Sequence, residues 1–205
     1  MFETTDELLK QIRLGEDSAL ELKNLKYKGD QVNDPHRDSM ANELAAMANT
    51  ANGVFVLGVE DGTRTVLGIP LDKLDAVETW VRGICNDLIT PQLFCRIRKI
   101  PVVVEDGVER VIIRVDVPKS LYVHKSPGGY YHRIGSSKRE MTPDVLARLF
   151  QQRSQVRLIR FDEQSVTTAP RDCLDKALWE KFKPPYSLDS DEDFLLKLKL
   201  LTQDD

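Results

Sequence analysis

The sequence predicts an α+β fold, in which helices pack on a mixed, mostly antiparallel sheet and a partial helical unit follows at the C-terminal end. Three observations predict this fold. Apolar residues at helical spacing lead directly into a continuously apolar stretch at 54–59. Two runs rich in β-branched residues flank the turn residues 105–107 within the segment 94–117. After Val156 a polar connector separates short helical patterns from the rest of the chain.

The segment 36–61 is expected to form a helix, a tight turn at Asn52-Gly53 and a buried strand. One apolar stripe runs along the helix and consists of Met40, Leu44, Met47, Ala48 and Ala51. Gly53 is expected to end the helix at positive φ. The strand is apolar at every position from 54 to 59, which predicts burial of both faces, and it delivers Glu60 and Asp61 to its end.

The remaining elements follow from periodicity and turn residues. The strand near 20–23 alternates Leu20 and Leu22 with Glu21 and Lys23, so one of its faces is polar. In the hairpin at 94–117, one face is expected to be core and the other to carry arginines. The other expected elements are a helix at 4–14 capped by Thr5 or Asp6, a hairpin after Asp61, a helix at 71–89, a strand pair at 121–134 around Pro127-Gly128-Gly129, and a helix from Pro143 to about Gln155 capped by Thr142.

The length and the change in composition predict two units, 1–154 and 155–205. The second is expected to contain helices at 172–183 and 189–201 with an incomplete core, as at the start of a further domain in a longer protein. The net charge is −4, and the three cysteines form no CxxC pair. No signal peptide or membrane-spanning run is recognisable, so a cytoplasmic protein without a membrane partner is expected. The P-loop, GxGxxG and GxSxG motifs are absent from the sequence.

The first candidate site consists of four charged residues, Glu16, Glu21, Lys23 and Asp61. The period of two places Glu21 and Lys23 on the same face of a strand. If Asp61 ends a neighbouring strand, the three carboxylates could hold a divalent cation, and Lys23 could orient water or offset phosphate charge. The alternative is that the pattern is only the solvated face of a strand.

The second candidate site is the segment 119–139, which holds five cations and no acidic residue. Basic side chains interleaved with tyrosines and a Gly-Gly pair suit phosphate neutralisation and base stacking. The alternative is a solvated hairpin with ordinary core tyrosines. The expected nucleic-acid contacts are Lys119, Lys125, Tyr131, His132, Arg133, Ser136, Ser137, Lys138 and Arg139, with Arg98, Arg110 and Arg114 as additional phosphate contacts.

Three motifs together resemble the Schlafen-type Alba-like domain, a nucleic-acid-binding family often found at the front of bacterial transcriptional regulators. They are Glu16-x4-Glu21-Leu22-Lys23, the stretch from ELAAMANTANGVFVLGVEDG to VLGI at 43–69, and YYHRIGSSKRE at 130–140. The resemblance covers about 5–153 and implies an α+β fold. The segment 157–205, with FDE at 161–163, also resembles the lead into a divergent ATPase-like domain.

The resemblance also implies a catalytic trio, because certain eukaryotic Schlafen RNases use acids that match Glu16, Glu21 and Asp61, with Lys23 in register. Those RNases pair two such lobes in one chain, and a homodimer would rebuild that arrangement here. The leading hypothesis is therefore a DNA- or RNA-binding module of a regulator-like protein, which needs no cofactor for binding. The alternatives are an endoribonuclease that uses Mg²⁺ or Mn²⁺ at the acid cluster, and a protein-interaction or oligomerisation domain.

Overall fold

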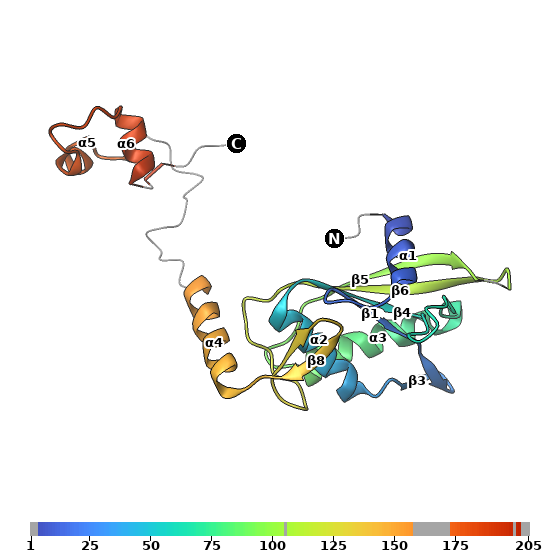
Figure 1. The fold of residues 1–205 in the computed structure, drawn as a ribbon. Helices are drawn as coiled ribbons and strands as arrows, with labels where there is room; N and C mark the ends of the chain where they lie inside the picture. The colour runs from blue at the N-terminus through green and yellow to red at the C-terminus, as the bar shows by residue number, and fades with distance from the viewer. Residues whose placement is uncertain (1–3, 105, 158–172, 199, 202–205) are drawn as a thin grey trace. The chain divides into compact units, whose positions relative to one another are not determined.

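The computed structural model describes residues 4–104, 106–157, 173–198 and 200–201. Contacts within the chain divide it into two units, Met1–Ser154 and Gln155–Asp205. The first unit has the predicted α+β architecture (Figure 1). Its elements are α1 (Thr5–Leu14), β1 (Leu20–Lys23), β2 (Lys26–Lys28), β3 (Gln31–Asp34), α2 (Arg37–Thr50), β4 (Gly53–Leu57), η1 (Leu71–Lys73), α3 (Leu74–Gly83), η2 (Ile84–Leu88), β5 (Arg96–Val103), β6 (Glu109–Val117), β7 (Tyr131–Ile134), β8 (Ser137–Glu140) and α4 (Pro143–Arg157).

The central sheet has four strands in the order β1-β4-β6-β5. Strand β1 runs parallel to β4, whereas β4 with β6 and β6 with β5 are antiparallel, so the sheet is mixed and mostly antiparallel as predicted. Strand β1 lies at one edge. Glu21 pairs in register with Phe55 of β4, which places the polar residues of β1 beside the most buried strand of the sheet.

Helices cover both faces of this sheet (Figure 1). Because side chains alternate along a strand, Val54 and Val56 belong to the core under α1, while Phe55 and Leu57 belong to the core under α2 and α3. All five residues of β4 are buried, which confirms the prediction for this strand. The face of β6 that was expected to carry arginines is also covered, since Ile112 packs under α1 and Arg114 is buried.

The helix–turn–strand at 36–61 forms as predicted, but Gly53 has a different role in the turn from the one expected. Helix α2 ends at Thr50, and Ala51 rather than Gly53 is the residue after it. Gly53 is the first residue of β4 and is not among the residues with positive φ. A side chain at Gly53 would overlap the buried Met47 side chain, so glycine at this position serves close packing and not backbone conformation.

Two further local predictions are corrected. The hairpin expected around Pro127-Gly128-Gly129 is displaced along the chain: β7 pairs with β8 across Gly135 and Ser136, and the Pro-Gly-Gly segment is a tight loop closed by a bridge between Ser126 and Gly129. Gly135 has a φ of 60°, which a glycine adopts without strain. Helix α1 is capped by Thr4, in a capping box with Glu7, instead of by Thr5 or Asp6.

The described part of the second unit contains α5 (Lys176–Trp179), η5 (Glu180–Phe182) and α6 (Asp191–Lys197). Its core is small and consists of Trp179, Phe194 and Leu195, with Leu174 and Leu201 packed against it. The predicted connector at 162–172 lies outside the described residues. In the part of the chain that the structure describes, no helix combines the length and apolar character needed to cross a membrane.

Candidate functional site

Strand β1 and the end of β4 bring together the four residues of the first candidate site. Glu21 and Lys23 project from β1 on the side of the sheet that α2 covers, because Leu20 and Leu22 occupy the opposite face under α1. The Glu21 side chain is only 3% exposed, while Lys23 is 23% exposed. The polar face of this strand is therefore largely buried, and it does not have the solvated character that the alternative interpretation requires.

The three carboxylates converge on the ammonium group of Lys23. Its Nζ lies 2.6 Å from Glu21 Oε1, 3.8 Å from Glu16 Oε1 and 4.0 Å from Asp61 Oδ2. Glu16 Oε1 also accepts a hydrogen bond from the backbone N–H of Leu22, at 2.8 Å, which fixes the carboxylate against β1. We refer to Glu16, Glu21, Lys23 and Asp61 as the acid–lysine cluster.

Burial and charge shift two pKa values in this cluster. Burial raises the pKa of Glu16, and the neighbouring charges of Glu21 and Asp61 act in the same direction, although the Leu22 N–H and Lys23 oppose them. Burial alone would lower the pKa of Lys23. Its hydrogen bond to Glu21 and the charges of Glu16 and Asp61 outweigh that effect and raise its pKa above 10.5, so Lys23 carries a stable positive charge.

This arrangement does not fit a divalent metal site. Within the described residues, no group of three or more His, Cys, Asp or Glu side chains is placed to hold a metal ion. The centre of the acids is occupied by the Lys23 ammonium, and the two oxygens of Glu21 face Lys23 and Arg133, respectively, each at 2.6 Å. The carboxylates are thus neutralised by cations of the chain itself.

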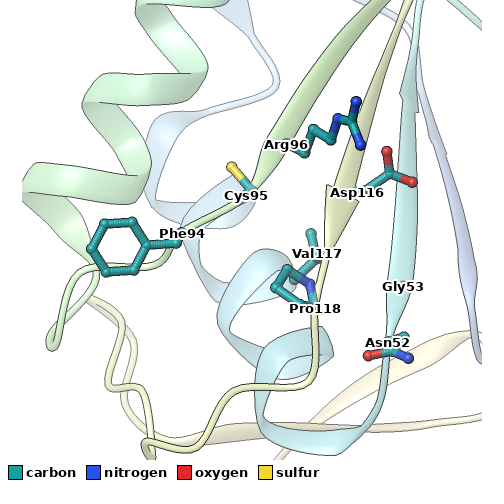
Figure 2. Close-up of a pocket in the computed structure, with 8 residues that line it drawn as sticks. All are labelled: Asn52, Gly53, Phe94, Cys95, Arg96, Asp116, Val117 and Pro118. Atoms are coloured by element: carbon teal, nitrogen blue, oxygen red, sulfur yellow. The ribbon is translucent and has the colours of Figure 1, made fainter. Parts of the chain in front are cut away.

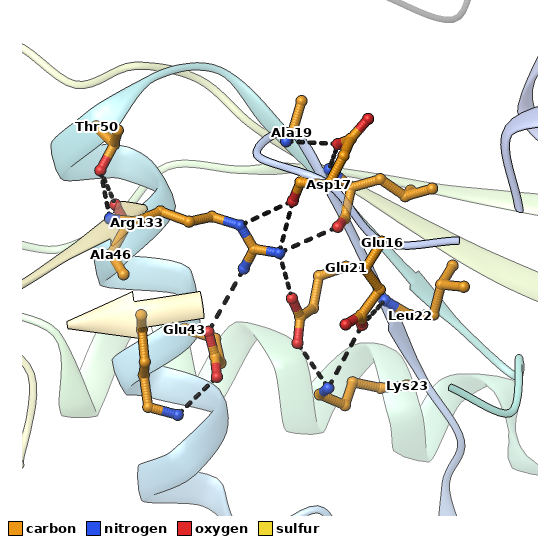
Figure 3. Close-up of polar contacts among 12 residues, drawn as sticks. Glu16, Asp17, Ala19, Glu21, Leu22, Lys23, Glu43, Ala46, Thr50 and Arg133 are labelled. Atoms are coloured by element: carbon orange, nitrogen blue, oxygen red, sulfur yellow. Dashed lines mark hydrogen bonds and ion pairs between the residues drawn. The ribbon is translucent and has the colours of Figure 1, made fainter. Parts of the chain in front are cut away.

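Arg133 connects the acid–lysine cluster to the hairpin formed by β7 and β8 (Figure 3). Its side chain is 1% exposed, and the guanidinium donates hydrogen bonds to the carbonyl oxygens of Asp17 and Leu20 at the start of β1. Glu21 Oε2 has no donor in hydrogen-bond geometry among the described residues, so its 2.6 Å contact with Arg133 is an ion pair. Arg133 therefore joins β7 to β1 and is not presented to solvent as a phosphate contact.

Glu43 of α2 continues the charge network toward the surface. Its Oε2 lies 3.6 Å from Arg133 Nη1, and its Oε1 lies 2.6 Å from Lys138 Nζ on β8. The sequence of contacts is thus Lys138, Glu43, Arg133, Glu21 and Lys23. Alternating charges along this chain of contacts connect a partly exposed lysine of the hairpin to the acids at the edge of the sheet.

Polar side chains of α2 hold the hairpin in place, and the sequence analysis did not single them out. Asn49 exchanges hydrogen bonds with the backbone of His124 and donates one to the carbonyl of Tyr131. Thr50 Oγ1 accepts from the N–H of Arg133, and Asn42 Oδ1 accepts from the N–H of Gly128. Asn42 and Asn49 are seven residues apart, so a second, polar stripe on the predicted helix was the available signal.

The residues predicted to contact nucleic acid differ in their exposure. Arg133 is buried, whereas Tyr131, His132 and Lys138 are half-buried. The exposed members are Lys119, Lys125, Ser136, Ser137 and Arg139. A pocket of about 220 Å³ lies beside His132, between the end of α2 and the start of α4, and Arg148 contributes to its wall.

The three arginines of the β5–β6 hairpin that were expected to make additional phosphate contacts have other partners. Arg98 and Arg114 both bind the carboxylate of Asp116, with nitrogen–oxygen distances of 2.7 Å and 2.6 Å. Asp116 therefore neutralises the two arginines from adjacent strands. Arg110 packs its aliphatic stem against Gly68, where an added Cβ would lie 2.5 Å from Arg110 Cβ. All three arginines thus make contacts within the first unit, to Asp116 or to Gly68.

The fold and the site define a class of protein: an α+β domain whose edge strand carries an acid–lysine cluster, connected by buried ion pairs to a basic hairpin. The chain belongs to the Schlafen, AlbA_2 family, whose model matches residues 16–142, more than half of the sequence. The matched region contains the cluster, α2 and the β7–β8 hairpin. Membership suggests a nucleic-acid-binding or nuclease-like domain.

Among solved structures, the chain is similar to the DIP2311 protein from Corynebacterium diphtheriae. The sequence identity is 21%, the TM-score is 0.47, and the match covers 87% of this chain but only 32% of the other. No curated protein matches the chain.

Proposed function

We propose that this chain is the nucleic-acid-binding module of a regulator-like protein, and that it binds the phosphate backbone through the β7–β8 hairpin and the segment before it. The observation that carries the proposal is the group of exposed residues Lys119, Lys125, Ser136, Ser137 and Arg139, within a family associated with nucleic acid. Cations and hydroxyl groups of this kind are the usual partners of phosphate oxygens.

The balance of charge on this segment favours an anionic partner. Of its five cations, Arg133 is neutralised by buried acids, and Lys138 is paired with Glu43. Lys119, Lys125 and Arg139 remain exposed in a chain whose net charge is −4. Because overall charge would repel a polyanion, attraction depends on these local cations, and binding should be sensitive to salt.

A nucleobase or sugar would make its contact at the pocket beside His132, the residue that pairs with Arg139 across the hairpin. His132 and Arg148 line the pocket of about 220 Å³, together with Asn49 and Thr50 from α2. A half-buried imidazole and an exposed guanidinium offer planar groups for stacking and donors for hydrogen bonds. The phosphate contacts would position the strand, and this pocket would receive part of one nucleotide.

The test is a titration of fluorescently labelled DNA and RNA with the full chain at several salt concentrations. For single-stranded ligand, log K should fall with log salt by roughly 0.7 for each phosphate contacted. The double variant Lys125→Ala/Arg139→Ala removes two exposed cations without touching the buried ion pairs. We expect it to weaken binding roughly tenfold at low salt and to lower the salt slope by about 1 to 2.

The matched control is Lys28→Ala, which removes an exposed lysine from the β2–β3 hairpin. It should leave affinity and salt slope unchanged. A slope near zero for the unmodified chain, or equal losses in the control and the double variant, would refute the proposal. Arg133→Ala is unsuitable for this test, because its effect on folding would be confused with an effect on binding.

The convergence of Glu16, Glu21 and Asp61 on Lys23 is the one observation in favour of the second candidate function, an endoribonuclease. The absence of a metal-binding geometry within the described residues weighs against the metal-dependent form of that chemistry. RNA is incubated with the chain, with and without Mn²⁺ or Mg²⁺, beside Glu21→Gln and Asp61→Asn variants. Metal-dependent cleavage lost in Asp61→Asn would establish the nuclease, whereas cleavage that persists in both variants would indicate contamination.

The homodimer that the resemblance implies is tested separately. Mass measurement in solution, with and without nucleic acid, gives the number of chains in each complex. A dimer that forms only with nucleic acid would support a two-lobed binding surface. A stable dimer that binds no nucleic acid would favour the oligomerisation domain instead.

A further inference from the structure

Two of the three cysteines lie in contact, although they are ten residues apart in the sequence. Cys85 belongs to η2 at the end of α3 and is 2% exposed. Cys95 precedes β5 and is half-buried. The two Sγ atoms are 3.4 Å apart, and both residues pack on the core beneath α2 and α3.

Backbone hydrogen bonds fix the segment that separates the two thiols. The N–H of Leu93 donates to the carbonyl of Cys85 at 3.2 Å, which closes the turn between them. Thr90 forms a two-hydrogen-bond bridge with Lys125, at 2.9 Å and 2.7 Å. The loop is thus anchored at both of these points, and the sulfur atoms stay close without a covalent bond.

Cys95 is the more accessible of the two cysteines, because it is half-buried whereas Cys85 is 2% exposed. Cys95 lies on the wall of a pocket of about 440 Å³, between Phe94 and Arg96 (Figure 2). Phe94, the neighbouring residue on this wall, is 79% exposed. Because Cys85 is buried, Cys95 is the thiol that a small oxidant is expected to meet first.

The contact also makes the two thiols unequal. The contact between the two sulfur atoms lowers the pKa of Cys95, while the same contact, together with burial, raises the pKa of Cys85. Cys95 is therefore the thiol that becomes a thiolate first. A partly exposed thiolate beside a second, protected thiol is the arrangement of a reactive cysteine with its resolving partner.

We propose that Cys85 and Cys95 form a dithiol that a peroxide oxidises reversibly to a disulfide. The Cys95 thiolate attacks one peroxide oxygen, an S–O bond forms, the O–O bond breaks, and the leaving oxygen departs as water after taking a proton. The Cys85 sulfur then attacks the sulfenic acid, an S–S bond forms, and the S–O oxygen leaves as a second water. The two thiols lose two electrons and two protons, and a dithiol reductant restores them by exchange.

Disulfide formation requires the sulfur atoms to approach by about 1.4 Å, from contact to bonding distance. The bond would join the end of α3 to the start of β5 and close a loop that contains Thr90. Thr90 pairs with the backbone of Lys125, so oxidation would restrict the motion of Lys125 within the segment 119–139 that is proposed above to contact phosphate. The disulfide itself does not depend on that proposed function.

The test treats the reduced full chain with hydrogen peroxide, blocks remaining thiols with an alkylating reagent under denaturing conditions, and measures the intact mass and the linked peptides. The Cys173→Ser variant, which keeps only the pair, should lose about two mass units, the two thiol hydrogens, and should recover them with dithiothreitol. The rate should be roughly tenfold higher than that of Cys173 in the Cys95→Ser variant.

The Cys95→Ser variant is the matched control, because serine preserves the size of the side chain at a half-buried position. Its buried thiol, Cys85, should stay reduced at peroxide concentrations that oxidise the pair in the unmodified chain. Three results would overturn the proposal: a pair that stays reduced while Cys173 oxidises, a Cys95 that proceeds to sulfinic acid without linking to Cys85, or a disulfide only between chains.

Discussion

Replacing Arg133 by methionine should destabilise the first unit strongly, because it leaves a carboxylate buried without its main partner. Methionine keeps the apolar stem and removes the guanidinium. Glu21 is 3% exposed and would keep only Lys23 as a neighbouring cation. The carbonyl oxygens of Asp17 and Leu20 would lose the hydrogen bonds that Arg133 donates.

The expected magnitude follows from these contacts. Breaking a buried ion pair by removing one member costs about 3–5 kcal/mol. Lys23 remains on the second oxygen of Glu21, which places the ion-pair loss near the lower limit. The loss of hydrogen bonds to two backbone carbonyls adds about 1 kcal/mol each. The free energy of unfolding should therefore fall by about 5 kcal/mol, a large part of the stability of an ordinary domain.

The assay is urea unfolding followed by the fluorescence of Trp80, which packs against the core of the first unit, in a Trp179→Phe background that silences the second unit. Arg139→Met is the matched control, since this exposed arginine lies on β8 of the same hairpin, and its cost should stay below about 0.5 kcal/mol.

A double-mutant cycle separates the ion pair from the general loss of packing. Arg133→Met combined with Glu21→Gln removes both charges, so the double variant should be more stable than the sum of the two single losses predicts, by about 2 kcal/mol. Strict additivity would show that the two side chains do not act as a pair. A cost below about 1 kcal/mol for Arg133→Met alone would refute the reasoning altogether.

Three further predictions concern stability. Burial lowers the pKa of His124 below 6.5, so on acidification the unfolded chain binds a proton at this residue before the folded chain does. The free energy of unfolding should therefore fall as the pH drops below 6.5, and it should fall less steeply in the His124→Gln variant. Urea unfolding at successive pH values measures both slopes. The pH dependence of stability has the opposite sign at Glu16, because burial raises the pKa of this carboxyl group and the folded state keeps the proton to higher pH. The free energy of unfolding should decline as the pH rises above 4.5. The same urea series should give a smaller decline for the Glu16→Gln variant. Gly53→Ala should cost about 1–3 kcal/mol through overlap with Met47, as thermal unfolding would show. The cost of Gly53→Ala should be smaller when it is measured in a Met47→Ala background, and equal melting temperatures for the unmodified chain and Gly53→Ala would contradict the packing argument.

Much of the fold could be predicted from local patterns. The apolar stripe of α2 and the unbroken apolar run of β4 are properties of contiguous residues, and both elements formed where they were expected. The turn residues at 105–107 likewise indicated the β5–β6 hairpin. The prediction of a hairpin around Pro127 was wrong. Two neighbouring segments, at 127–129 and at 135–136, both contain glycine and could form the turn, and only the pairing of Tyr131 with Glu140 in the folded chain shows that the second one does.

The candidate site divides in the same way. Alternation along β1 determined that Glu21 and Lys23 share a face, and the family motifs singled out Glu16 and Asp61 as their companions. Which of those charges is buried, and against what, depended on contacts between segments far apart in the sequence. Arg133 reaches Glu21 across more than 100 residues, because α2 holds the β7–β8 hairpin against the start of β1.

The sequence by itself therefore determined most of the elements, the two clusters of charge and the family, because each depends on the order and spacing of nearby residues. Only the tertiary structure decided that Arg133 is a buried connection and that Lys23 occupies the centre of the acids. It also brought Cys85 and Cys95 into contact. The physical reason is that charge and thiol chemistry depend on burial and on distances of a few ångströms, which are set when the elements pack together.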